Sequence, residues 1–146
     1  LAEAIAAATG CAVPEKNRIV LNGERAAGWM SPDEYLLILP RAEVPAAVAA
    51  IGEKLAGQHH LAADISDARA VFSIEGAKAA DVLMKLSPAD VLALAPGELR
   101  RSRTAQVAAA FWAEGQGYRL VCFRSVAEYV MGLLSTAAKP GGELGL

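Results

Sequence analysis

The sequence contains little cysteine and few aromatic residues. Of its 146 residues, two are cysteine, and phenylalanine, tryptophan and tyrosine together make up 5%. Two cysteines are too few for a disulfide framework, and Cys122, inside an apolar run, is most simply a small buried hydrophobic side chain. The net charge of -2 and the pI near 5.7 argue against a nucleic-acid-binding protein, which needs a dense positive field.

Long hydrophobic runs are also missing. No apolar run approaches the ~18 residues of a membrane-spanning helix; the longest are Tyr35 to Leu39 and Val107 to Ala113. Apolar residues nevertheless make up 54% of the chain, many of them alanine, and the mean hydropathy is +0.31. An excess of apolar surface without a membrane span predicts a subunit interface. No basic-then-apolar signal peptide is visible, so the expected location is the cytoplasm.

Residues 60–86 form the most clearly patterned stretch. Alternating apolar residues predict one strand over 61–65 and a second over 70–74, joined by a polar turn at 66–69. Gly76 then precedes a helix that is predicted to run to Leu86, because its apolar residues recur at helical spacing.

The remaining elements follow from the same kinds of pattern. Helices are predicted over 1–8, 42–57 and 126–138, and strands over 18–21, 35–39, 104–112 and 118–124. Asn22-Gly23 predicts an N-terminal hairpin turn, and 91–101, which Pro96-Gly97 interrupts, is predicted to be a loop. Two Ser-to-Glu spacings, Ser31 to Glu34 and Ser125 to Glu128, have the form of capping boxes that start a helix.

The order of elements, β-α-β-β-α-β-β-α, predicts the α+β class. Its simplest arrangement is an antiparallel sheet with helices on one face, with a ferredoxin-like β-α-β-β-α-β core followed by a β-α extension. The length suits a single domain. We place that α+β domain at 28–138, after an N-terminal segment at 1–27 and before a flexible tail at 139–146.

Candidate chemical groups are few, and each has a simpler interpretation. His59-His60 could bind a metal ion, but neighbouring strand residues point to opposite faces and no cysteine or carboxylate follows at ligand spacing. Turn capping and a surface ion pair explain Asp64, Asp67 and Arg69. A glycine-rich phosphate loop, a nucleophile-elbow serine and a cysteine–histidine pairing are all absent from the sequence.

Basic and aromatic residues leave two interpretations open. Arg100, Arg101 and Arg103 form either a solvated loop or a patch that binds an anion or a partner. Trp29 and Trp112 either stack on a planar ligand such as a pterin or pack in a core or an interface. We predict no catalytic, cofactor-binding or metal-binding residue, and we assign Trp29, Arg103 and Trp112 to a partner interface.

An ordered set of short motifs runs from about residue 28 to residue 138. It comprises WMSPDEYLL from Trp29, HHLAADISDAR from His59, FSIEGAKAADVL from Phe72, LSPAD from Leu86, Arg103-Thr104, and FRSVAEY from Phe123. The set resembles the gamma subunit of heterotetrameric sarcosine oxidase. Each motif alone is unspecific, because similar patterns recur throughout the folate-dependent aminomethyltransferase superfamily, but the ordered set is much more specific. The segment before Trp29 and the C-terminal tail match poorly.

The resemblance implies a cytoplasmic complex with alpha, beta and delta subunits that oxidatively demethylates sarcosine. Its products are glycine, hydrogen peroxide and a one-carbon unit on tetrahydrofolate. FAD, FMN, NAD and the tetrahydrofolate site are expected in the larger subunits and zinc in the smallest. The gamma subunit is expected to be an accessory piece that resembles part of the aminomethyltransferase fold.

One stretch of this sequence favours the accessory role. Transferase relatives carry a catalytic carboxylate on the strand before the last hairpin, whereas Ser102 to Trp112 contains no Asp or Glu. This stretch therefore lacks the group that general acid–base chemistry on folate would use.

Two alternatives stay open. A free-standing folate-binding or one-carbon transfer protein would have a cavity near Trp112 and Tyr118 with an inward-facing carboxylate. The equivalent subunit of an N-methylglutamate dehydrogenase-like complex would keep the accessory role with another substrate. As an oxidase subunit, the isolated chain is expected to bind neither flavin nor folate and to self-associate.

Overall fold

The protein forms two compact units, Leu1–Ser66 and a second that begins at Asp67. The structure is a computed structural model that describes residues 1–145. The expected boundary at residue 27 lies inside the strand Arg25–Ser31, which pairs with the strand Ile19–Asn22 of the same unit. Each unit has its own antiparallel sheet and its own helices.

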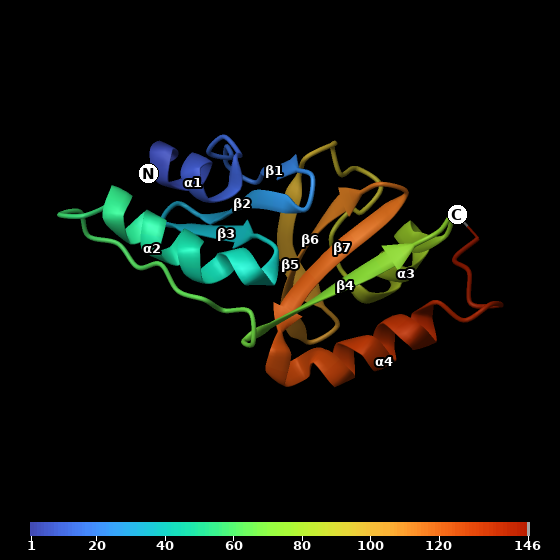
Figure 1. Ribbon diagram of the computed structural model, residues 1–146. Coiled ribbons are helices and arrows are strands. Elements are labelled where there is room, and N and C mark those ends of the chain that lie inside the picture. The colour runs from blue at the N-terminus through green and yellow to red at the C-terminus, as the bar shows by residue number, and fades with distance from the viewer. Residues whose placement is uncertain (146) are drawn as a thin grey trace. The chain divides into compact units, whose positions relative to one another are not determined.

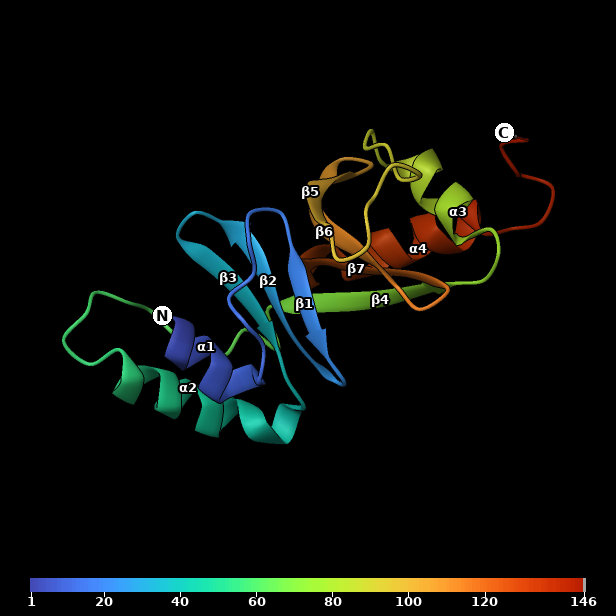
Figure 2. The ribbon, with the colours of Figure 1, turned by 90° about the horizontal axis from the view of Figure 1, so that it is seen from above.

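The first unit is a three-stranded sheet with two helices. Its strands, β1 (Ile19–Asn22), β2 (Arg25–Ser31) and β3 (Glu34–Ile38), lie in the order β1-β2-β3. The helices are α1 (Ala2–Thr9) and α2 (Val44–Lys54), the latter preceded by a 3₁₀ turn at Arg41–Glu43. Both helices lie on the same side of this sheet (Figure 2). Ile5 of α1, Cys11 and Ala27 form the buried centre of the unit.

Two tight hairpins build this sheet. Asn22 pairs with Arg25, so Gly23 and Glu24 form the first loop. Gly23 has a φ of 61°, which glycine adopts without strain, and the predicted hairpin is confirmed. Ser31 pairs with Glu34, which makes Pro32-Asp33 the second loop.

The predicted helical turn at Ser31–Glu34 is therefore wrong. The Ser31 hydroxyl donates a hydrogen bond of 2.6 Å to Oδ1 of Asp33. The polar side chains thus bond within the hairpin loop, and the apolar run that follows continues as β3.

The second unit is a four-stranded sheet covered by two helices. Its strands are β4 (Arg69–Glu75), β5 (Leu99–Thr104), β6 (Val107–Glu114) and β7 (Gly117–Phe123), in the order β4-β7-β6-β5, and every pair is antiparallel. The helices α3 (Ala79–Leu86) and α4 (Ala127–Ala137) contribute Leu83 and Val130 to the same core. Figure 1 shows both helices beside this sheet.

Alternation along the strands gives this sheet a helix-covered face and a helix-free face. Ile74, Phe111 and Leu120 pack into the core with the helices, so their neighbours along each strand point the other way. The register places these residues on the helix-free face: Arg69, Val71, Ser73, Glu75, Leu99, Arg101, Arg103, Ala108, Ala110, Trp112, Glu114, Arg119, Val121 and Phe123.

Two predicted strands need correction. Residues 61–65 are irregular and Leu61 is 90% exposed, so the chain enters the sheet only at Arg69. The region 91–101, predicted to be a loop, contains the first three residues of β5. Thr104, the predicted start of the next strand, is instead the last residue of β5. Ala105, at a φ of 50°, lies in the turn to β6. Three arginines in β5 interrupt the alternation of apolar residues that would predict a strand. The strand is stabilised by its backbone hydrogen bonds to β6.

The α+β class, with antiparallel strands and helices on one face, is confirmed. The strands are divided between two sheets, so the ferredoxin-like order does not form one continuous sheet. Helix α4 lies where the last helix was predicted, but Ser125 and Glu128 form no capping box: Val126 is the N-cap and no side chain caps the helix. The expected tail is irregular over residues 139–145, and Leu146 lies outside the described residues.

Candidate partner interface

Trp29 lies on β2 in the first unit. It pairs with Tyr35 of β3, and Tyr35 packs against the cluster of Ile5, Cys11 and Ala27. The indole is half-buried. Because cross-strand partners share a face, Trp29 lies on the side of the sheet that α1 covers.

Arg103 and Trp112 lie together on the helix-free face of the second unit. Arg103 is opposite Ala108, and Trp112 is opposite Leu99, on the adjacent strands β5 and β6. Arg103 is exposed, whereas Trp112 is only 1% exposed. The expected basic cluster is split, because Arg100 lies on the other face and pairs with Glu98.

A chain of polar contacts crosses this face. The indole Nε1 of Trp112 donates to Oε2 of Glu114 at 2.9 Å, and Nε of Arg119 donates to Oε1 of the same carboxylate at 3.2 Å. Arg119 also donates to the hydroxyl of Ser73. Both carboxylate oxygens of Glu114 are therefore in use, and the contacts join β6, β7 and β4.

Glu114 matters because it is the carboxylate on β6. The sequence stretch that ends at Trp112 has none, but the strand continues two residues further and ends at Glu114. Its carboxylate bonds to Trp112 and Arg119, both on the sheet face, rather than facing a ligand with a free oxygen. This geometry suits a structural ion pair better than proton transfer.

Exposed apolar side chains gather near the edge strand β4. Val71 is 51% exposed and Phe123 is 49% exposed, both on the helix-free face. The guanidinium of Arg69 lies over the Phe123 ring, 4.0 Å from the ring centroid, in a cation–π contact. On the other side of β4, Met131 of α4 is 52% exposed.

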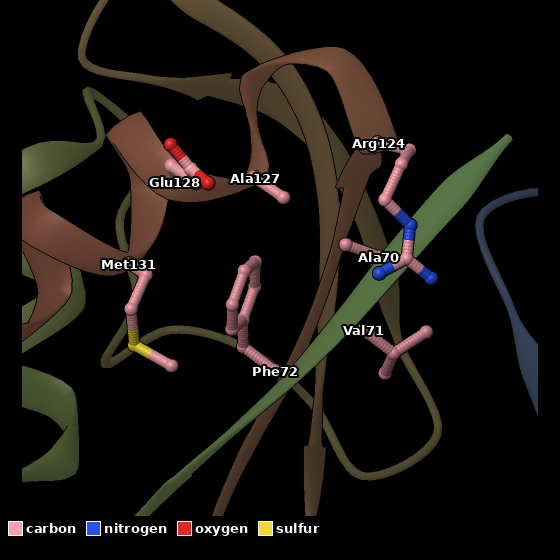
Figure 3. Close-up of a pocket in the computed structure, with 7 residues that line it drawn as sticks. All are labelled: Ala70, Val71, Phe72, Arg124, Ala127, Glu128 and Met131. Carbon is pink, nitrogen blue, oxygen red and sulfur yellow. The ribbon is translucent and has the colours of Figure 1, made fainter. Parts of the chain in front are cut away.

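A hollow of about 280 Å³ lies between β4 and the start of α4. Figure 3 shows the Phe72 ring projecting from β4 toward Ala127 and Met131, with Arg124 at the opposite end beside Ala70 and Val71. Five of the seven lining residues are apolar, and Arg124 and Glu128 add a positive and a negative charge. Sequence reasoning missed this hollow, although its signal is present: Met131 marks the exposed edge of the apolar stripe of α4.

The candidate metal and turn residues make local contacts. Nδ1 of His60 lies 2.9 Å from the carbonyl oxygen of Gln58, and both histidines are exposed. Within residues 1–145, no three His, Cys, Asp or Glu side chains come together in a group that could hold a metal ion.

Three titratable groups are shifted by their surroundings. The pKa of Asp64 is lowered, chiefly because the Ser66 hydroxyl and backbone amide donate hydrogen bonds to its carboxylate. The Ser31 hydroxyl lowers the pKa of Asp33 in the same way. Burial raises the pKa of the Cys122 thiol, which makes it a poor nucleophile.

The helices of residues 1–145 do not combine the length and apolar character that crossing a membrane requires.

Comparison with known proteins supplies the family. Residues 1–139 match the sarcosine oxidase, gamma subunit family. Among solved structures, the chain is similar to one chain of the heterotetrameric sarcosine oxidase from Corynebacterium sp. U-96 in complex with pyrrole 2-carboxylate. The identity is 28%, the match covers 92% of this chain and 71% of the other, and the TM-score is 0.83. No curated protein sequence matches. The chain thus belongs to the sarcosine oxidase gamma subunit family, as its ordered motifs indicated.

Proposed function

We propose that this chain is an accessory, non-catalytic gamma subunit of a heterotetrameric sarcosine oxidase. In this role it assembles with alpha, beta and delta subunits, and the complex converts sarcosine to glycine, hydrogen peroxide and a one-carbon unit on tetrahydrofolate. FAD, FMN, NAD, the folate and zinc are bound by those partner subunits. The complex acts in the cytoplasm.

The observation that carries this proposal is the similarity to a chain of a heterotetrameric sarcosine oxidase over nearly the whole sequence. A TM-score of 0.83 over 92% of the chain means that both the first and the second unit have counterparts there. The family match over residues 1–139 supports the same role independently of the coordinates.

The arrangement of polar groups supports a non-catalytic role. A general acid or base must reach the reacting group with an available atom. In this chain Glu114 shares its carboxylate between Trp112 and Arg119, and Asp64 and Asp33 bond to serines of their own turns. The buried thiol of Cys122 has a raised pKa. The three carboxylates are thus engaged in contacts within the chain, and the thiol is a poor nucleophile.

Exposed residues support a role in assembly. Arg103 is exposed on the helix-free face, and Trp29 is half-buried on β2; we propose both as partner contacts. Trp112, at 1% exposure, would contribute through Glu114, which its indole holds in place. Arginine and tryptophan side chains are the types that contribute most to binding energy at interfaces.

Reconstitution of the oxidase with and without this chain tests the proposal. The three other subunits are expressed together, sarcosine-dependent hydrogen peroxide production is measured, and the purified chain is then added. The complete set should be more active or more stable than the incomplete set, and the chain alone should produce no peroxide. Peroxide production by the isolated chain, or no effect of adding it, would contradict the proposal.

A titration with tetrahydrofolate separates the first alternative. Trp29 and Trp112 both report on binding through their fluorescence, and a free-standing folate protein would show saturable quenching. An accessory subunit should show none. Comparing sarcosine with N-methylglutamate as the substrate of the reconstituted complex separates the second alternative.

A further inference from the structure

Strand β4 has an unpaired edge. It lies at one end of the sheet order β4-β7-β6-β5, and within residues 1–145 no strand pairs with its other side. Such edges normally carry charged side chains, a proline or a bulge that prevents pairing with another chain. β4 reads RAVFSIE over Arg69–Glu75 and pairs without interruption with β7, so it has no proline and no bulge, and its charged residues, Arg69 and Glu75, have opposite signs and lie at its two ends.

The hydrogen-bonding groups at this edge can be assigned to residues. The backbone N–H of Arg124 donates to the carbonyl of Ala68 at 2.9 Å, and Arg69 is opposite Phe123 in the next position. Hydrogen-bonded and non-hydrogen-bonded pairs alternate in an antiparallel ladder. The main-chain groups of the even-numbered residues of β4 therefore face β7, and those of Arg69, Val71, Ser73 and Glu75 face outward.

The side chains of β4 are complementary to those of an antiparallel copy. We propose that the β4 edge pairs with the β4 edge of a second copy of this chain, with Phe72 opposite Phe72 across a two-fold axis. In this register Arg69 lies opposite Glu75 at both ends, and Val71 lies opposite Ser73. All outward-facing main-chain groups then find partners, because odd-numbered residues pair with odd-numbered residues.

Neighbouring registers are less favourable. If the second strand shifts by two residues so that the centre of pairing moves toward the N-terminus, Glu75 lies opposite Asp67. Like charges directly opposite each other are destabilising. A shift the other way sets Arg69 opposite Ala77, so both ion pairs are lost. The register with Phe72 at the centre is thus selected by charge as well as by the aromatic pair.

The surroundings of the edge also favour this partner. Val71 is 51% exposed, and pairing would cover it with the second copy's Ser73 and backbone. The Phe72 ring borders the hollow of about 280 Å³ beside Met131 and Ala127. Side chains approach most closely in non-hydrogen-bonded pairs, so the ring of the second copy's Phe72 would enter this space. Glu75 is exposed and able to meet Arg69 of the other copy.

Charge exchange in the isolated full-length chain tests the pairing. The molecular mass in solution is measured by sedimentation over a range of protein concentrations, for the unchanged chain and for Arg69→Glu, Glu75→Arg and the double variant. Each single change puts like charges opposite each other at both ends and should weaken the dimer about tenfold. The double variant should restore the affinity. Glu53→Arg, the same exchange on exposed α2, is the control and should change nothing.

Disulfide cross-linking provides a second test that does not depend on the folding of the charge variants. Phe72→Cys should form a disulfide-linked dimer on mild oxidation, because position 72 faces itself within the Cα spacing that a disulfide requires. Ser73→Cys, which faces Val71, should link much less. The native cysteines are buried. The proposal is wrong if the chain stays monomeric at every concentration. It is also wrong if neither single charge variant weakens the dimer and Ser73→Cys cross-links as well as Phe72→Cys. The pairing does not depend on the subunit role, because it concerns the chain on its own.

Discussion

Gly117 lies beside the carbonyl group of Ile74 so closely that a Cβ atom added to Gly117 would be 2.1 Å from the Ile74 oxygen. Gly117 is the first residue of β7 and pairs with Glu75 at the end of β4. The last pair of the β4–β7 ladder therefore has no room for a side chain at position 117. This glycine is required by close backbone approach rather than by an unusual φ angle.

Gly117→Ala should strongly destabilise the second unit. The methyl group would meet backbone, which cannot move without separating β4 from β7, so we expect a loss of about 3 kcal/mol. Urea unfolding followed by circular dichroism measures it. Gly132→Ala is the control: an added Cβ meets nothing within 4 Å on α4, and the change should stabilise by about 0.5–1 kcal/mol. Equal effects of the two changes would refute this view of Gly117.

Thr104→Val should leave the protein equally stable or make it more stable. Thr104 is fully buried, and its hydroxyl oxygen has no hydrogen-bond partner within the described chain. An unpaired buried hydroxyl costs about 1–3 kcal/mol, which an isosteric methyl group avoids. The midpoint of thermal unfolding is the measurement, and a clear fall in that midpoint would show that the hydroxyl has a partner in solution.

Lys85→Met should destabilise the packing of α3 on α4. The ammonium group of Lys85 donates a hydrogen bond of 2.7 Å to the carbonyl of Ala137, in the last turn of α4. A positively charged donor at a helix C-terminus bonds to an otherwise unpaired carbonyl and is attracted to the negative end of the helix dipole. Its removal should therefore lower the free energy of unfolding by about 1–2 kcal/mol. Lys78→Met is the matched control. The side chain of Lys78 is 70% exposed, and its Nζ lies 3.8 Å from Oδ2 of Asp81. Its removal should lower the free energy of unfolding by less than about 0.5 kcal/mol.

Ser66→Ala should raise the pKa of Asp64 toward its ordinary value of 3.8. A carboxyl whose folded-state pKa is lowered stabilises the fold above its unfolded pKa. That contribution is lost as the pH falls through the lower, folded value. Removing the Ser66 hydroxyl removes the largest cause of the lowering.

An NMR titration of the Asp64 carboxyl measures this shift. Asp33, whose pKa is lowered by Ser31, provides an internal control: Ser66→Ala should leave it unchanged, and Ser31→Ala should reverse the pattern. An Asp64 titration that is the same in both variants would contradict the hydrogen-bond explanation.

Local patterns predicted the helices well because their apolar stripes need only one covered face. The stripe that includes Val130 and Leu134 predicted α4, and both side chains are buried. Local patterns also predicted α2 and the hairpin at Asn22-Gly23, where Asn22 pairs with Arg25. These features depend on residues that are close together in the sequence.

The errors in the strands and at Ser31 concern elements whose structure depends on distant partners. Arg101 and Arg103 give β5 the polar composition of a loop, and the segment forms a strand because it pairs with β6. Leu61 and Ile65 alternate like the residues of a strand, but within the described chain they belong to neither sheet, and Leu61 is 90% exposed. Ser31 has the spacing of a helix cap, yet β3 pairs with β2 and turns the motif into a hairpin loop.

The candidate site was predictable only in part. The sequence indicated which residue types to expect at an interface, and the family resemblance indicated the kind of partner. Neither showed that Arg103 and Trp112 share one face of a sheet, or that the β4 edge lies open beside Phe72. Both features arise from strand order, which joins residues far apart in the chain.

Native mass spectrometry of the co-expressed oxidase tests the subunit role most directly. The affinity tag is placed on this chain, and the four subunits are produced together. The accessory role predicts that the tag recovers one assembly containing all four subunits and able to oxidise sarcosine. Recovery of this chain alone, while the other three subunits form an intact and fully active oxidase without it, would contradict that role.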